Sequence, residues 1–303
     1  MDRPADASTD APTDAPGSTQ TQVGPATGHG SDGRTAVVTG AGRGLGRRLA
    51  LALAADGARV GLVSRSATQL EETARLIREA GGEALAWPMD ASSPEAVESL
   101  RDAVTSRLGA PGVLVNAAGM FGPIALIRDS DPEAWIQTIM VDLVASYLTC
   151  RAFVGGMLDA GWGRIVNVTS AASLHPPGPL NSAYATAKVG LNQLTRHLAA
   201  EIAGSGVTAN VIHPGDLKTD MWADIRDRVS RMGTEADAFR QWAEWVERTG
   251  GDPPDKAVAL VMRLVNDPDP SAPNGQFLWI EDPLQPPIPS WVEPAASQPW
   301  RQR

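Results

Sequence analysis

The chain has 303 residues, 43% of them hydrophobic, which is enough to bury the core of one α/β domain of ordinary size. Its net charge of −9 and pI near 5.0 argue against a nucleic-acid partner, because phosphate backbones are bound by clustered Lys and Arg, and the arginines here are scattered. A single cysteine, Cys150, excludes an internal disulfide framework and a cysteine-rich metal site, so we expect no bound metal and a reducing, cytoplasmic environment.

Residues 1–33 are mostly Ala, Pro, Thr, Ser, Asp and Gly. Such a segment cannot offset the entropy of ordering, so we expect a disordered N-terminal tail. It lacks the apolar core of a signal peptide, and no window of the chain approaches the roughly 18 consecutive apolar residues of a membrane span. We therefore expect no membrane partner.

Residues 34–281 alternate between short β-branched runs and longer amphipathic runs. The first run, RTAVVTG, predicts a strand that ends at glycines, and GLGRRLALALAADG predicts the helix after it. Repetition of this pattern predicts seven strands and further helices over about 67–80, 94–108, 132–160, 181–203 and 254–266. The fold class is therefore α/β, a single domain with a doubly wound parallel sheet and helices on both faces.

Two segments depart from this alternation. Residues 219–250 are irregular and partly helical, with aromatic side chains among charges, and Phe239, Trp242 and Val246 share one helical face. Residues 282–303 contain six prolines and cannot extend the sheet, so we expect a Pro-rich C-terminal tail.

The turn after the first strand, TGAGRGLGR, has glycines at positions 40, 44 and 46. Backbone N–H groups and the helix dipole at such a turn bind a pyrophosphate, and bulkier side chains would block its approach. Glycines also end strands and allow helices to pack closely, so the turn alone is weak evidence. The strand before it and the helix after it favour a dinucleotide site.

The segment SAYATAKVG places Tyr184 four residues before Lys188, so both side chains lie on one face of a helix. The chain holds only two tyrosines, which makes a phenol among small residues unusual. A phenol has a pKa of about 10, and a nearby ammonium favours the phenolate and lowers that pKa. Without other motifs, the pair is better explained as a half-buried aromatic ring and a solvated lysine.

With NAAG at 116–119 and the strand RIVNVTS ending at Ser170, these motifs resemble the short-chain dehydrogenase/reductase family over about residues 34–280. The resemblance implies a Rossmann-type fold and an oxidoreductase that interconverts a ketone or aldehyde with an alcohol. It implies that Tyr184 is the general acid or base, and that an oxidised nicotinamide joins Lys188 in lowering its pKa. It also implies that Lys188 holds the nicotinamide ribose and that Ser170 hydrogen-bonds the substrate oxygen.

Ser170 lies one position further from Tyr184 than the family's usual spacing, so Ser173 is an alternative. The strand ends at Ser170, which favours Ser170. The remaining polar residues near these motifs are interpreted as structural: Thr169, His197 and His213.

Asp142, in MVDLVAS, stands where the family usually has a catalytic asparagine. An aspartate can keep the backbone role of that residue, in which case the dehydrogenase chemistry is conserved. Alternatively, it adds a buried charge that pairs with Lys188 and weakens or repurposes the proton relay. A non-redox or cofactor-sensing protein is therefore an alternative function.

Ser64 and Arg65 follow the second strand, where an acidic side chain would bind the ribose 2′-hydroxyl of NAD. Arg65 and Arg43 would together bind a 2′-phosphate, so we expect NADP(H) as cofactor. NAD(H) is the alternative if both are ordinary surface arginines. The resemblance places further cofactor contacts at Gly40, Gly44, Leu45, Gly46, Asp90, Ala91, Asn116, Ala117, Gly119, Pro214, Gly215 and Thr219. Within this set Asp90 is expected to contact the adenine and Asn116 to stabilise the strands, and ordinary strand-end residues are the alternative for both.

In relatives, the segment that corresponds to 219–250 is a lid over the substrate, a small carbonyl compound or alcohol. Trp222 and Trp242 are therefore substrate candidates, together with His175 in the loop before Tyr184. A helix packed by its aromatic stripe and a structural His175 are the alternatives. The resemblance also implies a homo-oligomer, and the unusual end of the last strand, FLWIEDPLQPP, leaves dimer and tetramer both open.

Deletion of residues 1–32 is expected to leave the fold and cofactor binding intact, because so polar a segment has almost no apolar surface to bury. Thermal unfolding and cofactor titration of the full and shortened chains measure this. A large loss of melting temperature in the shortened chain would contradict the expectation.

Overall fold

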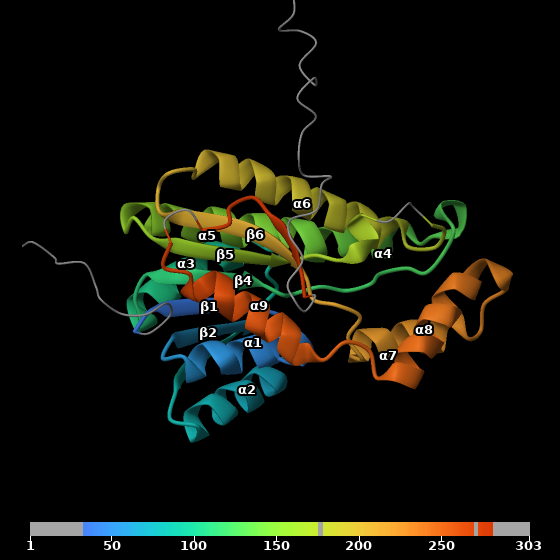
Figure 1. The fold of residues 1–303 in the computed structure, drawn as a ribbon, viewed down its shortest axis with the longest axis horizontal. Helices are drawn as coiled ribbons and strands as arrows, with labels where there is room; N and C mark the ends of the chain where they lie inside the picture. Colours follow the sequence, from blue (N-terminus) through green and yellow to red (C-terminus); the bar gives the residue numbers. More distant parts are fainter. Residues whose placement is uncertain (1–32, 175–177, 270–271, 281–303) are drawn as a thin grey trace, which may run out of the picture.

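The computed structural model describes residues 33–174, 178–269 and 272–280, so the expected tails lie outside the described residues except for Gly33. The strands are β1 (Thr35–Thr39), β2 (Arg59–Ser64), β3 (Glu83–Pro88), β4 (Pro111–Asn116), β5 (Gly163–Val168), β6 (Val207–His213) and β7 (Phe277–Trp279). They form one parallel sheet in the order β3-β2-β1-β4-β5-β6-β7 (Figure 1). The predicted seven-stranded parallel sheet is confirmed.

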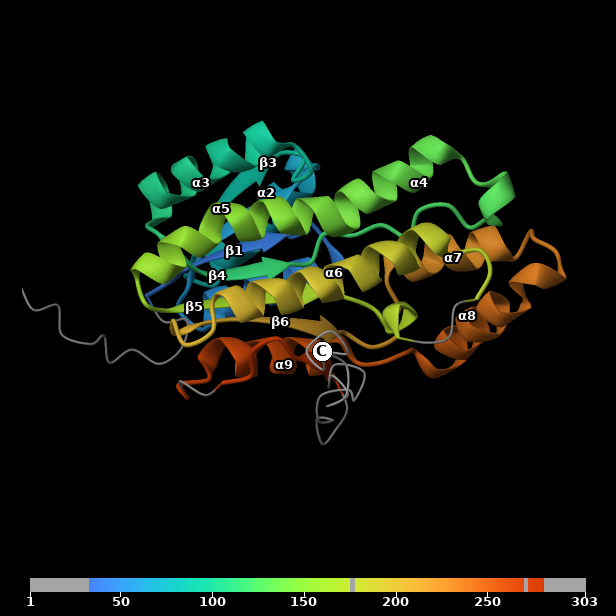
Figure 2. The same ribbon diagram turned by 90° about the horizontal axis from the view of Figure 1, so that it is seen from above.

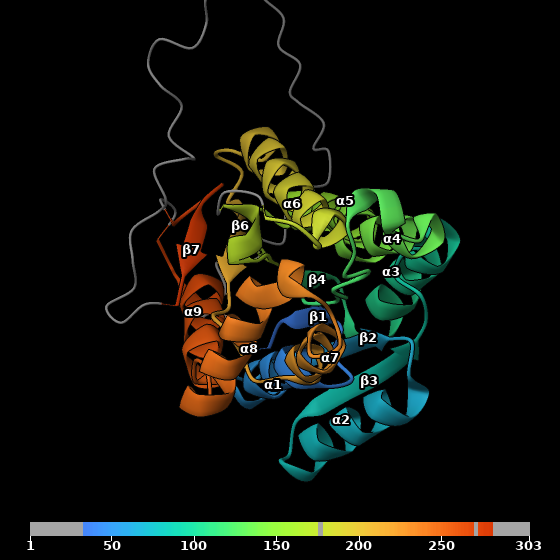
Figure 3. The ribbon, with the colours of Figure 1, turned by 90° about the vertical axis from the view of Figure 1, so that its right-hand side faces the viewer.

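Helices cover both faces of the sheet, as predicted (Figure 3). One face carries α1 (Gly44–Ala55), α2 (Ala67–Glu79) and α9 (Pro254–Asn266). The other face carries α3 (Pro94–Leu108), α5 (Ala145–Asp159) and α6 (Ser182–Glu201). Side chains of β1 alternate between these layers, because Ala36 and Val38 pack with the first set of helices and Val37 packs with the second. A strand that is buried on both faces therefore reads as one apolar run.

Two helices begin at serine caps. The Ser66 hydroxyl accepts the Gln69 N–H at the start of α2, and the Ser93 hydroxyl accepts the Ala96 N–H at the start of α3. Such caps satisfy backbone donors that the helix itself leaves unpaired. They explain why both helices begin where the sequence predicts.

The helical run after β4 is not uniform, which corrects the single helix predicted over 132–160. It consists of α4 (Pro132–Ile139), a π turn (Met140–Val144) and α5. A π turn pairs each carbonyl with the N–H five residues on, so it is wider than an α-helical turn, and such turns are frequent at functional sites. Here the π turn contains Asp142, which is fully buried.

The same run, 132–159, is long and apolar enough to span a membrane by length and composition, with a mean hydropathy of 1.3 in its best window. The expectation concerned unbroken apolar runs, and this run is interrupted by Glu133, Asp142 and Arg151, so the expectation is not contradicted. Half of that window is buried inside the protein. There α5 packs on β4 and α4 packs on α6, as in a core helix of this fold.

The helices α7 (Asp220–Val229) and α8 (Asp237–Thr249) project beyond the carboxyl ends of the strands (Figures 1 and 2). They form most of the segment 219–250 that was expected to be a lid. Ile225 of α7 packs in a separate apolar cluster that includes Phe121 and the Tyr184 ring. The segment 219–250 therefore rests on the residues that surround the candidate catalytic tyrosine.

Candidate active site

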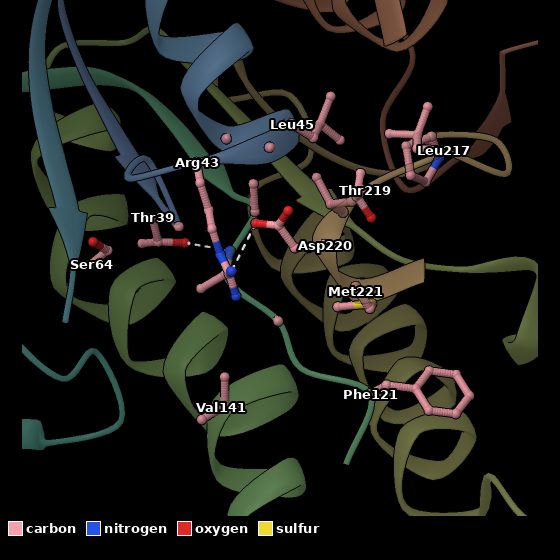
Figure 4. A pocket seen from close by; sticks show the side chains of 18 of the residues that line it. Thr39, Arg43, Leu45, Ser64, Phe121, Val141, Leu217, Thr219, Asp220 and Met221 are labelled. Atoms are coloured by element: carbon pink, nitrogen blue, oxygen red, sulfur yellow. Dashed lines mark hydrogen bonds and ion pairs between the residues drawn. The ribbon is translucent and has the colours of Figure 1, made fainter. Parts of the chain in front are cut away.

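A cleft of about 580 Å³ lies at the carboxyl ends of the first six strands (Figure 4). The strands β1 to β3 lie in one half of the sheet and β4 to β7 in the other, so the strand order reverses between β1 and β4. Open parallel sheets bind ligands at such a switch point. Each of these strands contributes a residue at or just beyond its end to the wall of the cleft: Gly40, Ser64, Asp90, Ala117, Ser170 and Pro214.

The glycine turn, residues 40–46, exposes its backbone to the cleft. Gly40 has a φ of 69°, and a Cβ there would lie 2.7 Å from the Ala117 carbonyl oxygen at the end of β4. A Cβ on Gly46 would collide with the Gly40 carbonyl oxygen. The N-terminus of α1 can therefore approach the sheet edge closely, which suits a bound pyrophosphate. The residues of the turn that line the cleft include Gly40, Arg43, Gly44, Leu45 and Gly46.

Arg47 braces the glycine turn, a role that the sequence reasoning missed. Its Nε donates to the Gly42 carbonyl at 3.1 Å and to the Thr73 hydroxyl at 3.0 Å. Thr73 donates in turn to the Ala41 carbonyl at 3.0 Å, so α2 holds the backbone of the turn in place. The only sequence signal was the position of Arg47 four residues after Arg43.

The end of β2 presents a hydroxyl and a guanidinium to the cleft. The Ser64 Oγ is buried there without a hydrogen-bond partner, and Arg65 is exposed at the rim. Asp90 also lines the cleft, and its pKa is lowered by the Ser92 N–H, the Ser92 hydroxyl and the Arg65 charge. These groups, with the neighbouring Ala91, fit the ribose and base of a nucleotide.

Arg43 reaches across the mouth of the cleft to Asp220, the first residue of α7 (Figure 4). Its guanidinium lies 2.8 Å from the carboxylate, and the two side chains are 62% and 69% exposed. An ion pair so exposed contributes little to stability and exchanges readily for another anion. The two residues are 177 positions apart, so their pairing could not be predicted from the sequence.

The loop after β6 borders the opposite end of the cleft. Pro214, Gly215 and Thr219 line it, as the resemblance implied for the nicotinamide end. Thr219 caps α7, because its hydroxyl oxygen accepts the Trp222 N–H at 3.4 Å. The hydroxyl proton of Thr219 is not used by this cap and can serve a ligand.

Tyr184, Lys188 and Ser170 meet between these two ends. Tyr184 and Lys188 project from one face of α6, and only 9% and 3% of their surfaces are exposed. The Lys188 Nζ lies 5.5 Å from the centre of the Tyr184 ring. Ser170, just beyond β5, lines the same part of the cleft, and its hydroxyl lowers the pKa of Tyr184. Burial of the ammonium contradicts the alternative of a solvated lysine.

Asp142 lies beside this group and brings a second charge to it. The Met120 N–H donates to its Oδ1 at 2.8 Å, whereas its Oδ2 has no hydrogen-bond partner. The Oδ2 is 3.8 Å from the Lys188 Nζ, and the two side chains are 0% and 4% exposed. Of the two alternatives for Asp142, the geometry matches the buried charge that pairs with Lys188.

Burial and charge set the proton affinities of this group. Burial raises the pKa of Asp142 to about 6, while the charge of Lys188 opposes this rise. Burial also raises the pKa of Tyr184 well above its usual range, the Asp142 carboxylate raises it further, and the hydrogen bond with Ser170 lowers it. The lowered pKa was expected from Lys188 together with an oxidised nicotinamide, and for that state it stays a prediction.

Two residues of the sequence analysis stand behind the wall of the cleft. Asn116, expected among the cofactor contacts, donates to the Asn167 side chain at 2.9 Å and accepts from Thr149 at 2.8 Å. It therefore ties β4 to β5 and α5. Ser173 donates to the Ser170 carbonyl at 2.6 Å and does not line the cleft, which favours Ser170 of the two serines.

The other polar residues have structural partners. The His213 Nδ1 accepts the Ala171 N–H at 3.2 Å, and Thr169 is buried at the end of β5. His197 lies on the exposed face of α6. These contacts agree with their interpretation as structural residues. His175 lies outside the described residues.

The lid side of the cleft is apolar. Trp222, which is 4% exposed, and the half-buried Trp242 both line it. The Phe121 ring lies 4.9 Å from the Tyr184 ring and 5.7 Å from the Phe239 ring. The aromatic stripe of α8 therefore both packs the lid and faces the cleft. Residues that the sequence reasoning missed here are Phe121, Val141, Leu217 and Met221 (Figure 4).

Comparison with known proteins gives this site a family. The model for short chain dehydrogenases matches residues 34–230. The chain belongs to the short-chain dehydrogenase/reductase family. It is 36% identical over 194 residues to the 3-oxoacyl-(acyl-carrier-protein) reductase FabG of Pseudomonas aeruginosa, which covers 64% of this chain and 77% of that protein. It is 37% identical over 193 residues to the D-beta-hydroxybutyrate dehydrogenase of Rhizobium meliloti. This match covers 62% of this chain and 73% of that protein.

Solved structures of the same fold hold either form of nicotinamide cofactor. An NAD+-bound xylitol dehydrogenase matches with a TM-score of 0.75 and 26% identity, over 82% of this chain and 98% of that one. An NADPH complex of an actinorhodin polyketide ketoreductase variant matches with a TM-score of 0.73 and 30% identity. This match covers 81% of this chain and 95% of that one. This short-chain dehydrogenase is therefore an NAD(P)-dependent oxidoreductase of alcohol and carbonyl substrates.

Asp142→Asn is expected to change how stability depends on pH. The carboxyl has a pKa of about 6 in the folded protein, above its ordinary value of 3.8. Between these values the folded state binds more protons than the unfolded state, so stability falls as pH rises. From about pH 4 to pH 7 the free energy of unfolding of the wild-type protein should fall by up to about 3 kcal/mol relative to that of the variant.

Urea unfolding at several pH values measures this difference. Asp159→Asn is the matched control, because Asp159 is an exposed residue at the end of the same helical run. Its stability should follow that of the wild-type protein at every pH. Parallel pH profiles for wild type and Asp142→Asn would contradict the expected burial of an ionised carboxylate.

Proposed function

We propose that the protein is an NADP(H)-dependent oxidoreductase that interconverts a ketone or aldehyde with an alcohol, with Tyr184 as general acid or base. One observation carries the proposal: Ser170, Tyr184 and Lys188 converge in the same cleft that the glycine turn borders. A nucleotide site and a proton donor in one cleft supply the two things that carbonyl reduction needs, a hydride and a proton.

Residues of both ends of the cleft would hold the cofactor. The glycine turn suits the pyrophosphate, Asp90 and Ala91 suit the adenine, and Lys188 is within the same cleft for the nicotinamide ribose. When bound, the reduced cofactor supplies a hydride, with its two electrons, to the carbonyl carbon. The carboxamide end would meet the loop after β6, at Pro214, Gly215 and Thr219.

Tyr184 gives its proton to the carbonyl oxygen, and Ser170 donates a hydrogen bond that holds that oxygen in place. In the reverse direction, the Tyr184 phenolate takes the proton of the alcohol. General acid catalysis of this kind contributes about 10²- to 10⁴-fold to the rate. Lys188, whose Nζ donates to the Val168 carbonyl at 3.1 Å, is fixed close to the phenol.

The charges at the end of β2 support NADP(H) over NAD(H). Ser64 stands where a carboxylate would bind the 2′-hydroxyl of NAD, and Arg65 and Arg43 both line the cleft. Arginine binds phosphate through two parallel hydrogen bonds, and the exposed pair of Arg43 with Asp220 leaves it able to turn to a phosphate. The relatives include complexes of both cofactors, so the family alone does not decide.

The lining of the lid supports a ring-containing or largely apolar substrate. Phe121, Trp222 and Trp242 surround the approach to Tyr184, and apolar walls with a few polar groups are typical of small-molecule sites. One relative is by name a polyketide ketoreductase, which agrees with such a substrate. The segment 219–250 would close over it as a lid.

Exposed apolar side chains on the outer helices support a homo-oligomer. Ile136 on α4, Leu158 on α5 and Val189 on α6 are 57%, 41% and 50% exposed. Contact between copies would cover them, in a homo-oligomer of catalytic domains that span 34–281 between terminal tails. The single cysteine is free and buried, which suits the cytoplasm.

Tyr184→Phe is expected to lower turnover with NADPH and an aromatic ketone such as tetralone by about 100-fold or more, because the phenol proton is lost. NADPH binding, followed by fluorescence titration, should persist. Tyr147→Phe is the matched control, since Tyr147 is the other tyrosine and is 47% exposed on α5. A cofactor sensor would lack turnover in the wild type, and the substitution would leave its cofactor response unchanged.

Arg65→Ala is expected to weaken NADPH binding by roughly tenfold to a hundredfold, because the variant loses a charge-assisted hydrogen bond to the phosphate. Binding of NADH, which lacks the 2′-phosphate, should change far less. Arg48→Ala, on the exposed face of α1 and outside the cleft, controls for the change in net charge. Equal dissociation constants for NADPH and NADH in the wild-type protein would refute the cofactor preference.

A further inference from the structure

Lys188 and Asp142 form an ion pair that is closed to solvent. Their charged atoms lie 3.8 Å apart, and the side chains are 4% and 0% exposed. The Lys188 Nζ also donates to the Val168 carbonyl, so its position is fixed. Because water does not screen charges at such a depth, the pair acts strongly on any proton that moves nearby.

The groups around the carboxylate are few and come from two sides. From the loop after β4, the Met120 N–H donates to Oδ1. From α6 come Lys188 and Tyr184, the titratable groups whose charges are coupled to Asp142. The Oδ2 has no hydrogen bond, so its negative charge is balanced by Lys188 alone. A neutral asparagine in the π turn would leave the ammonium unopposed.

The balance of these charges decides whether the phenol keeps its proton. An unopposed ammonium favours the phenolate, whereas a carboxylate disfavours it. In this chain the carboxylate opposes the ammonium, and both burial and Asp142 raise the pKa of Tyr184. Asp142 therefore adds to the effect of burial and opposes the effect of the ammonium on Tyr184.

We propose that Asp142 is the counter-ion of Lys188 and keeps Tyr184 protonated, so that this chain works as a carbonyl reductase at neutral pH and oxidises alcohols only in alkaline solution. Asp142 is a positioning residue for charge, since it acts on the reacting proton through Lys188 and Tyr184. This inference rests on the proposed function and adds the working direction to it.

The chemistry follows from the proton that each direction needs. Reduction uses the phenol, which gives its proton to the carbonyl oxygen and regains one from solvent. Oxidation needs the phenolate, which takes the proton of the alcohol while the hydride leaves the carbon for the oxidised cofactor. An enzyme cannot change the equilibrium between the two, so a variant that oxidises faster must either reduce faster in proportion or change its relative affinity for the oxidised and reduced cofactors.

The decisive experiment measures the phenolate of Tyr184 directly. In a Tyr147→Phe background Tyr184 is the only tyrosine, so the ultraviolet absorbance of phenolate during alkaline titration reports on it alone. Adding Asp142→Asn is expected to lower its titration midpoint by about one pH unit or more. Asp159→Asn in the same background is the control and should leave the midpoint in place. This readout needs neither cofactor nor turnover, so it is independent of the proposed function.

The second readout is the pH profile of alcohol oxidation with NADP+ and tetralol. For Asp142→Asn the pH at half-maximal kcat/KM should fall by the same interval, and at pH 7 kcat/KM should rise about tenfold for each unit. If both proteins unfold in alkali before the Tyr184 phenolate forms, the pH profile of oxidation is the measurement that tests the proposal. The same midpoint and the same profile in both proteins would overturn the proposal. If Asp142→Asn does not fold, the protein with Asp142 alone tests the proposal. An alkaline titration midpoint of Tyr184 at or below that of Tyr147 would overturn it.

Discussion

A parallel sheet places the carboxyl ends of its strands along one edge, and every part of the site depends on this constraint. Six strands from distant parts of the chain end at the cleft, so each loop needs to contribute only one or two groups. The close approach of Gly40 to the Ala117 carbonyl brings the N-terminus of α1 to that edge. The nucleotide end and the proton-transfer end of the cleft are thereby held in fixed relation, which hydride transfer requires.

Features that arise from local rules could be predicted from the sequence. Strands buried on both faces are continuous apolar runs, and helices show apolar residues at helical spacing, so the alternation of elements and several helix bounds were correct. The glycine turn is recognisable because only residues without a Cβ fit there. The shared face of Tyr184 and Lys188 follows from their spacing alone. What these features have in common is that neighbours in the sequence determine them.

Features that depend on tertiary contacts could not be predicted. The π turn leaves the apolar pattern of its helix almost unchanged, so the sequence indicated one uniform helix. The brace from Arg47 to Thr73 and the ion pair of Arg43 with Asp220 join elements that only the fold brings together. Asn116 differs from these, because its side chain connects two strands and a helix, which agrees with the strand-stabilising role that the resemblance implied.

Burying Asp142 is unfavourable unless something compensates, because the fold removes water from a carboxylate and supplies one N–H and one distant ammonium in return. A neutral residue at that position would leave the native state with less charge to bury. Proteins retain such destabilising groups mainly where function uses them. Here the group stands next to the one phenol whose proton is at stake, and the same low-dielectric surroundings that raise the pKa of Asp142 raise that of Tyr184. Stability and proton transfer are thus linked through one buried carboxylate.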